Sequence, residues 1–369
     1  MASLTETAYY ARRGVKFGTI GFVVLLILWW TGTGLVNFWQ ATHPEPPPPP
    51  AASFGALPPI EFPESKMAVN QFTLQTPAGN LGTFPDRLQV FVAPAKKSSF
   101  LAPDNAAKLA AKLGFTSSPT LETSTLYRWS IVAPLPSILE MDIINTQFTL
   151  RRNWSADPTI ITNKRFVSEA QSILDARTFL TVSGLISPDL LGQEKATFLR
   201  TQGDQFIPAI SLSESDFVKV DFFRSNYTPI VVQLAGGATK TPTPTGTAAP
   251  NFAFYTPDPS QGIVTVITSG ASDEAKKIID VNYRYTPIEY ESFSEYPLKT
   301  VQQAWDELNS NQGYIASYTG GGQAVVRRVN LGYFDPLTPH QYIMPIYVFT
   351  GDDNLVAYVS ALSDSLIQR

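Results

Sequence analysis

The sequence predicts an α+β protein with a single N-terminal transmembrane helix, followed by antiparallel sheets that pack a few helices. Three observations support this prediction. Residues 17–39 are apolar and carry no charge, many later runs alternate apolar and polar residues, and three stretches repeat apolar residues at helical spacing. Alternating runs are typical of strands in antiparallel sheets that have one solvated face.

The first element is the apolar segment 17–39. A helix needs about 20 apolar residues to cross the hydrocarbon core of a bilayer, and this segment is long enough. It exceeds the apolar core of a cleaved signal peptide, and no small-x-small cleavage pattern follows it. The segment therefore predicts a retained membrane anchor, with the lipid bilayer as its partner.

Charges around the anchor predict its orientation. Basic residues lie before it, whereas Glu45 is the one charged residue among the twenty that follow. Since basic residues stay on the cytoplasmic side, we expect residues 1–16 to be cytoplasmic and the body to be extracytoplasmic. The residues that define this topology, including two aromatic residues expected at the membrane interface, are Arg12, Arg13, Lys16, Phe38 and Trp39.

Two low-complexity segments divide the part of the chain that follows the anchor. Residues 40–63 are rich in proline and predict an extended stalk that acts as a spacer. Residues 236–251, rich in threonine and proline, predict a disordered or long exposed loop. This loop either separates domains or interrupts one sheet, and the apolar runs on both sides favour the second reading. We expect one α+β domain over 64–270 and a second over 271–369.

Composition excludes several kinds of site. The chain has no cysteine, which rules out disulfides, zinc–thiolate sites and thiol catalysis. Its two histidines are His43, in the stalk, and His340, which we expect to cap a turn. Residues 17–369 hold 24 basic and 30 acidic residues, a charge of −6, which argues against a nucleic-acid partner. We expect no cofactor and no metal. A disulfide-free outer domain fits a bacterial cell surface.

Three helices are expected in the body. The first runs to Leu113, the second carries Ile173 and Leu174 on one face, and the third buries Trp305. The expected caps and ends are Asp104 or Asn105 and Gly114 for the first helix, Ser168 for the second, and Thr300 and Gly313 for the third. Gly320 to Gly322 lack the Gly-Lys-Ser/Thr of a phosphate-binding loop, so we expect a hairpin turn there.

The C-terminal part predicts a helix, a glycine exit and a three-stranded antiparallel meander with its last turn at 351–354. This order resembles the terminal module of YycI and YycH, membrane-anchored regulators of a bacterial sensor kinase, and of related PepSY-like extracytoplasmic domains. The resemblance covers about the last 70 residues. The residues that match are Pro345, Tyr347, Phe349, Tyr358, Val359 and Ala361. The resemblance implies an anchored regulatory module, and its residues are core and turn positions.

One cluster of carboxylates has the composition of a sugar site. Glu289, Glu291 and Glu295 alternate beside Tyr290 and Phe293. A glycosidase needs two carboxylates across a cleft, whereas alternate residues of one strand share a single face. We therefore expect a solvated edge, with a glycan site as the alternative.

These observations predict a non-enzymatic, membrane-anchored, extracytoplasmic protein of a bacterial envelope that interacts with, or regulates, another envelope protein. The alternative is a cell-wall protein that binds or hydrolyses glycans.

Overall fold

The computed structural model describes residues 18, 21–22, 25–35, 39, 51–65, 67, 69–94, 96, 98–229 and 251–368. The chain divides into two compact units, residues 1–49 and residues 50–369. In the first unit the described residues are helical, and Trp39 among them is exposed. Arg12, Arg13, Lys16 and Phe38 lie outside the described residues, so the orientation drawn from them stays a prediction.

No helix within the described residues is both long and apolar enough to cross a membrane.

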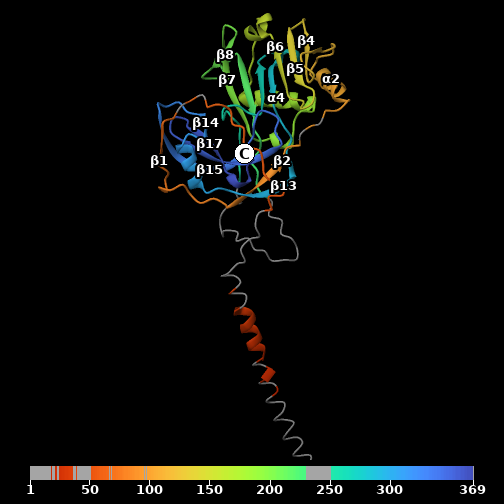
Figure 1. Ribbon diagram of the computed structural model, residues 1–369. Coiled ribbons are helices and arrows are strands. Elements are labelled where there is room, and N and C mark those ends of the chain that lie inside the picture. Colours follow the sequence, from red (N-terminus) through yellow and green to blue (C-terminus); the bar gives the residue numbers. More distant parts are fainter. Residues whose placement is uncertain are drawn as a thin grey trace, which may run out of the picture. The chain divides into compact units, whose positions relative to one another are not determined.

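The second unit is an α+β body, as predicted, and its described strands form two sheets (Figure 1). The nine-stranded sheet is antiparallel throughout, in the order β3-β4-β5-β6-β12-β11-β9-β7-β8. Its strands are β3 (Thr120–Leu121), β4 (Leu126–Ile131), β5 (Ser137–Asp142), β6 (Phe148–Arg152), β7 (Glu194–Gln202), β8 (Gln205–Pro208), β9 (Phe217–Phe222), β11 (Val264–Ser269) and β12 (Ile278–Tyr283).

Helices and a large apolar core cover one face of the nine-stranded sheet. Alternate residues of β5 are buried, for example Leu139 and Met141, and they pack with Ala106 of α2 and Leu180 of α4. At one end of the other face, Phe217 and Ile267 form a smaller core with the segment around Ile160. All six residues of β11 are buried. The helical segments of this lobe are α2 (Ala102–Lys112), η1 (Trp154–Ala156), α3 (Thr159–Thr162), α4 (Glu169–Ser183), η2 (Pro188–Leu190) and α5 (Glu274–Lys277).

The helix ends confirm one prediction and correct another. Ser168 caps α4 and accepts a hydrogen bond from the backbone N–H of Gln171, as expected. Helix α2 begins earlier than predicted, with Leu101 at its N-cap and no side-chain cap. The physical reason is Pro103, which is favoured in the first turn of a helix and lets it start before Asp104.

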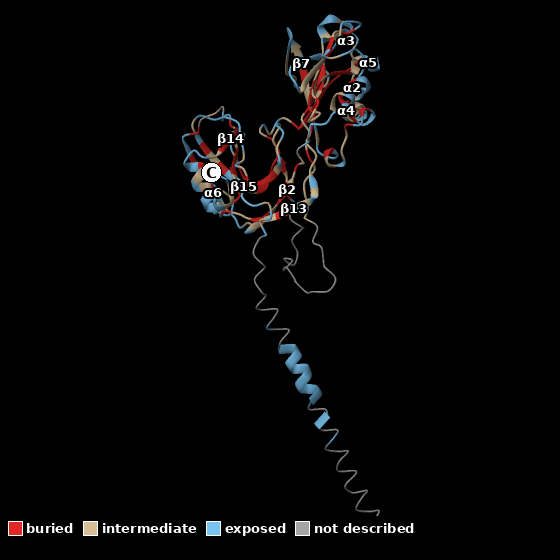
Figure 2. Cartoon of the chain, turned by 45° about the vertical axis from the view of Figure 1, so that its right-hand side comes forward, coloured by how far each residue is buried: buried red, intermediate tan, exposed pale blue. Residues whose placement is uncertain are grey.

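The second sheet has eight strands among the described residues, several of them off its main path. Buried residues lie along β2 and β15 of this sheet (Figure 2). Its main path is β1-β15-β16-β17-β14, with β10 beside β15 and with β13-β2 joined to the start of β16. Contrary to a purely antiparallel prediction, β1 and β10 pair parallel to β15. The strands are β1 (Gln71–Leu74), β2 (Arg87–Val92), β10 (Phe254–Tyr255), β13 (Glu289–Pro297), β14 (Tyr314–Ser317), β15 (Gln323–Phe334), β16 (Tyr342–Gly351) and β17 (Val356–Ser360).

The C-terminal meander forms as predicted, since β15, β16 and β17 pair antiparallel in chain order. Helix α6 (Val301–Asn309) starts with the capping box of Thr300 and Gln303, and the short η3 (Asp364–Leu366) lies near the C-terminus. The expected hairpin at 320–322 is wrong. Strand β14 pairs with β17 instead of β15, so these glycines connect two strands that are not partners.

Residues 51–63 correct the predicted stalk. Leu57 is fully buried and pairs with Ile367, and the backbone N–H of Ala52 donates to Glu295. The ring of Phe54 packs on Tyr342. Apolar residues between the prolines thus dock this segment on the eight-stranded sheet. Residues 40–50, the first part of the stalk, lie outside the described residues.

The two sheets do not divide at the expected boundary between residues 270 and 271. Strands β1 and β2 precede the nine-stranded sheet in sequence but belong to the eight-stranded one, whereas β12 belongs to the nine-stranded sheet. The chain therefore crosses between the sheets after β2, β9, β10 and β12. We call the two parts the nine-stranded lobe and the eight-stranded lobe, and the crossings between them the lobe junction.

The threonine- and proline-rich segment 236–251 falls outside the described residues apart from Asn251. On either side of it, Tyr227 and Phe252 form an antiparallel bridge with two backbone hydrogen bonds of 2.8 Å. The two residues that flank the segment are therefore paired with each other, although β9 before it and β10 after it belong to different sheets.

Candidate functional site at the lobe junction

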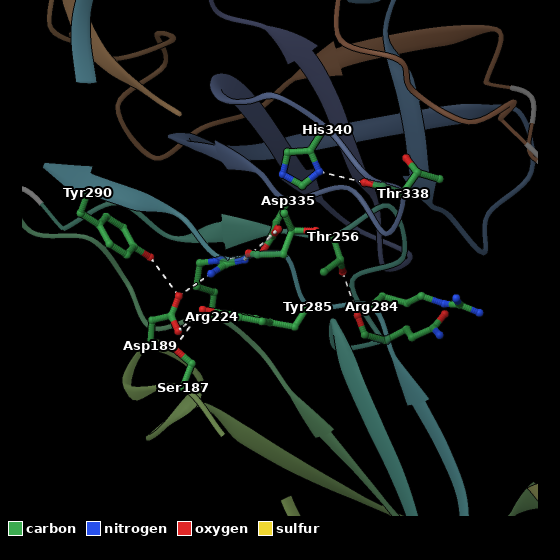
Figure 3. A network of polar contacts seen from close by, with 12 residues as sticks. Ser187, Asp189, Arg224, Thr256, Arg284, Tyr285, Tyr290, Asp335, Thr338 and His340 are labelled. Atoms are coloured by element: carbon green, nitrogen blue, oxygen red, sulfur yellow. Dashed lines mark hydrogen bonds and ion pairs between the residues drawn. The ribbon is translucent and has the colours of Figure 1, made fainter. Parts of the chain in front are cut away.

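Arg224 is the central residue of the lobe junction. It follows β9 directly, and its guanidinium is completely buried. Nε donates to Asp335 at 2.8 Å and one terminal nitrogen donates to the carbonyl of Thr286 at 2.9 Å. The other terminal nitrogen donates to Asp189 (Figure 3). Asp189 lies in η2 of the nine-stranded lobe, whereas Asp335 directly follows β15 of the eight-stranded lobe, so one side chain joins both.

Aromatic side chains complete the surroundings of this ion pair. The guanidinium carbon lies 4.9 Å from the ring centre of Tyr285 and 5.6 Å from that of Phe254. The hydroxyl of Tyr285 donates to Asp189 at 3.0 Å, and that of Tyr290 donates to the same carboxylate at 3.3 Å. These hydrogen bonds matter because two carboxylates face one guanidinium, which leaves one negative charge to be stabilised by neutral donors.

The surroundings of the network favour the protonated forms of its arginine and its two tyrosines. Burial alone would lower the pKa of Arg224, but the charges of Asp335 and Asp189 outweigh it and raise this pKa above its usual value. Burial also raises the pKa of Tyr285 and of Tyr290. Arg224, Tyr285 and Tyr290 therefore keep their protons at neutral pH. The arrangement can hold the lobes together but offers no group ready to donate or accept a proton.

His340 lies in the loop between β15 and β16, close to this network. Its Nδ1 lies 2.8 Å from the carbonyl of Thr338, and because a carbonyl only accepts, Nδ1 carries the proton. Its Nε2 is covered and has no hydrogen-bond partner in the described part of the chain. Burial lowers the pKa of His340. The imidazole of His340 is thus neutral. It is hydrogen-bonded to a carbonyl of a turn, as the sequence predicted.

Three hollows lie in a row around the lobe junction. The first has a volume of about 320 Å³ and is mainly apolar, the second about 200 Å³ and the third about 350 Å³. His340 and Gln341 line both the first and the second, and Lys96 and Pro287 line both the second and the third. The apolar hollow is formed by residues that include Pro58, Pro59, Ile60, Phe334, Tyr342 and Met344. Neighbouring hollows with shared walls form one long concave surface.

The carboxylates of the glycan alternative lie elsewhere. Glu289 and Glu291 are exposed and Glu295 is half-buried, on β13, which pairs with β2 alone among the described strands. Glu295 lies 3.9 Å from Arg87. None of the three lines the hollows of the lobe junction. Their alternation on an edge strand agrees with the expected solvated edge.

Sequence reasoning missed the network of Arg224. Its members are spread from Ser187 to His340, and each follows or precedes a strand without any motif around it. One signal was present: Asp189, Arg224 and Asp335 each stand within a few residues of an apolar run that predicts a buried element. In the described residues no group of three or more His, Asp or Glu side chains is placed to hold a metal ion.

The comparisons with known proteins give distant likenesses only. No model of a protein family matches the chain, and no curated protein matches it. Among solved structures it is similar to the Bacillus megaterium YpeB C-terminal domain, with 12% identity and a TM-score of 0.30 over 73% of this chain and 95% of that one. It is also similar to an uncharacterised protein from Eubacterium rectale, with 10% identity and a TM-score of 0.30 over 76% and 84% of the two chains. Structural similarity this distant supports no conclusion about function.

Proposed function

We propose that this chain is a non-enzymatic, membrane-anchored protein of a bacterial cell envelope that binds another envelope protein at its lobe junction. The row of hollows beside Arg224 is the observation that supports this proposal. The body lies on the extracytoplasmic side, and its task is interaction or regulation.

The chemistry of the junction favours binding over catalysis. The guanidinium of Arg224 is fully used by two carboxylates and a carbonyl. In the described residues His340 is hydrogen-bonded to a turn carbonyl, with no nucleophile or carboxylate as its partner. A rigid hollow with aromatic and aliphatic walls is instead suited to receive side chains of a partner.

The anchor is supported by composition and by local bonding. The segment 17–39 has no charge and follows three basic residues. Within it, the hydroxyl of Thr31 donates to the carbonyl of Ile27 at 2.8 Å, and that of Thr33 donates to the carbonyl of Trp29 at 2.9 Å. These internal hydrogen bonds satisfy polar groups that apolar surroundings would leave without a partner.

The regulatory part of the proposal rests on the resemblance of the last 70 residues to the terminal modules of YycI and YycH. Pro345, Tyr347 and Tyr358, which carry this resemblance, lie on β16 and β17 of the meander, where the rings of Tyr347 and Tyr358 are buried. They stabilise the fold, so the partner is to be identified by experiment.

Chemical crosslinking of intact membranes followed by affinity purification tests the partner. Gln341 is exposed and lines two hollows, so Gln341→Arg fills the junction without disturbing a core. The matched control is Gln205→Arg, an exposed glutamine on β8. We expect a co-purifying envelope protein that Gln341→Arg loses and Gln205→Arg keeps. Equal recovery with both variants would place the partner elsewhere on the body.

Protease added to intact spheroplasts tests the topology separately. We expect the body to be degraded, leaving a short membrane-bound fragment. Full protection of the C-terminal part would contradict an extracytoplasmic body.

A further inference from the structure

The third hollow of the lobe junction differs from the other two in its charge. It has a volume of about 350 Å³, and Lys96, Lys108 and Lys112 line it together with Thr146 and residues of α4 and β12. No carboxylate is among its lining residues. We call it the lysine hollow. In a chain whose residues 17–369 carry a net charge of −6, three lysines around one hollow that no carboxylate lines form a local excess of positive charge.

Helix α2 directs two of these lysines to one place. Lys108 and Lys112 are four residues apart, and Asn105 lies three residues before Lys108, so all three share one stripe of the helix. Like charges at this spacing weaken a helix by a few tenths of a kcal/mol. The only other charged residue of α2 is Asp104. Asp104 lies four residues before Lys108 on the same stripe, so the stripe of α2 carries one positive charge in excess.

Lys96 approaches the hollow from the crossing between β2 and α2. Its ammonium donates to the hydroxyl of Thr146 at 2.7 Å and to the carbonyl of Asn145 at 3.4 Å. Partial burial lowers the pKa of Lys96. Within the described residues, no ion pair involves Lys96, Lys108 or Lys112. The ammonium of Lys96 is therefore positioned by neutral groups.

The end of α4 offers a rival explanation for one lysine only. The C-terminus of a helix carries partial negative charge, which attracts a cation. The Nζ of Lys112 lies 3.6 Å from the point where a Cβ on Gly184, the C-cap of α4, would stand. The last carbonyls of α4 already accept from the backbone N–H groups of Gly184 and Leu185. Lys112 thus complements α4, whereas Lys108 and Lys96 have no such role.

We propose that the lysine hollow binds a phosphate group of an anionic ligand through Lys96, Lys108 and Lys112. Three lysines around one hollow match a phosphate, which carries up to two negative charges and several acceptor oxygens. Lysine binds phosphate as a point charge, whereas a planar carboxylate is better recognised by the fork of an arginine, and no arginine lines the hollow. The other titratable groups facing it, Tyr283 and Tyr285, use their hydroxyls on Leu185 and Asp189.

This inference does not depend on the proposed function, because it concerns a small anion and not a protein partner. The test is calorimetric titration of the full chain, in a non-ionic detergent, with inorganic phosphate and with tripolyphosphate. We expect binding of tripolyphosphate that weakens about tenfold in Lys108→Gln. The matched control is Lys195→Gln, an exposed lysine on β7 outside the hollow, which should bind as the unaltered chain does.

Stability and salt dependence separate the site from the rival role of Lys112. Lys108→Gln should leave the melting temperature unchanged, whereas Lys112→Gln should lower both affinity and melting temperature. Affinity should fall steeply with added salt, as for a contact between separate charges. No binding at tripolyphosphate concentrations up to about 10 mM, roughly ten times the Kd of a weak anion site, would overturn the proposal. An equal loss of affinity in Lys195→Gln would also overturn it.

The phosphate has two possible sources, a soluble phosphate ester and a lipid headgroup. Vesicles of phosphatidylglycerol and phosphatidylcholine, added to the titration, distinguish them. If phosphatidylglycerol vesicles compete with tripolyphosphate and phosphatidylcholine vesicles do not, the ligand is a lipid headgroup. If neither kind of vesicle competes, the ligand is soluble. Either result supports the site. Vesicle binding that Lys108→Gln leaves intact, together with no effect of tripolyphosphate, would contradict it.

Discussion

Replacing Arg224 by methionine is the sharpest perturbation of the lobe junction. The change leaves Asp335, which is 2% exposed, and Asp189, which is 15% exposed, without their cation. Breaking a buried ion pair in this way costs about 3–5 kcal/mol, because one or more charges remain uncompensated. We therefore expect Arg224→Met to lower the free energy of unfolding by an amount in this range.

A companion series separates charge from shape. Arg224→Lys keeps the charge but has three donors in place of a planar fork, and it loses the stacking on Tyr285. Because a hydrogen bond to a charged group is worth about 1.5–3 kcal/mol, we expect this variant to lose about that amount. Adding Asp335→Asn to Arg224→Met removes one uncompensated charge and should recover part of the loss. The two effects should not add, since the residues are in direct contact.

The assay is urea unfolding of the full chain in detergent, combined with hydrogen exchange read separately for each lobe. If Arg224 joins the lobes, the Met variant should show faster exchange at the junction while the centre of each sheet stays protected. A loss below about 1 kcal/mol, the size of an exposed ion pair, would refute the reasoning. So would a loss confined to one lobe.

Three further predictions concern the cores. Burial raises the pKa of Asp280 to about 6 from 3.8, so its contribution to stability is present below pH 3.8 and is lost as pH rises through 6. Asp280→Asn should therefore stabilise the chain by about 2 kcal/mol at pH 7.5 and have no effect at pH 3.5 in thermal melts. Trp305 is half-buried against Phe349, so Trp305→Ala should cost about 2–3 kcal/mol in urea unfolding, less than Phe349→Ala. A Cβ on Gly351 would meet the carbonyl oxygen of Val325 at 1.8 Å, so Gly351→Ala should cost about 1–3 kcal/mol by the same assay.

The sequence predicted what depends on local pattern. Alternation identified strands such as β4 and β6, the cap at Ser168 located the start of α4, and the order of elements after Thr300 predicted the meander. These features depend on residues that lie close together in the chain. Their physical causes are the burial of one face and the hydrogen bonding of a helix end. Both can be recognised from a short stretch of sequence.

Long-range pairing was beyond the same reasoning. Strand β1 pairs with β15 although about 250 residues separate them, and no turn or spacing links the two. Residues 51–63 read as a spacer because of their prolines, yet Leu57 and Phe54 between those prolines bind the segment to the body. Arg224 belongs to no motif in the sequence, and its role follows only from partners that three different connections bring to it.

The central claim is that the lobe junction receives an envelope protein, and site-specific photo-crosslinking in growing cells tests it most directly. A photoreactive amino acid at position 341 lies at the wall of two hollows, and the same residue at position 205 serves as the control. We predict one dominant crosslinked protein from position 341 and none of it from position 205. Absence of a specific crosslink at 341, or the same products from both positions, would contradict the account.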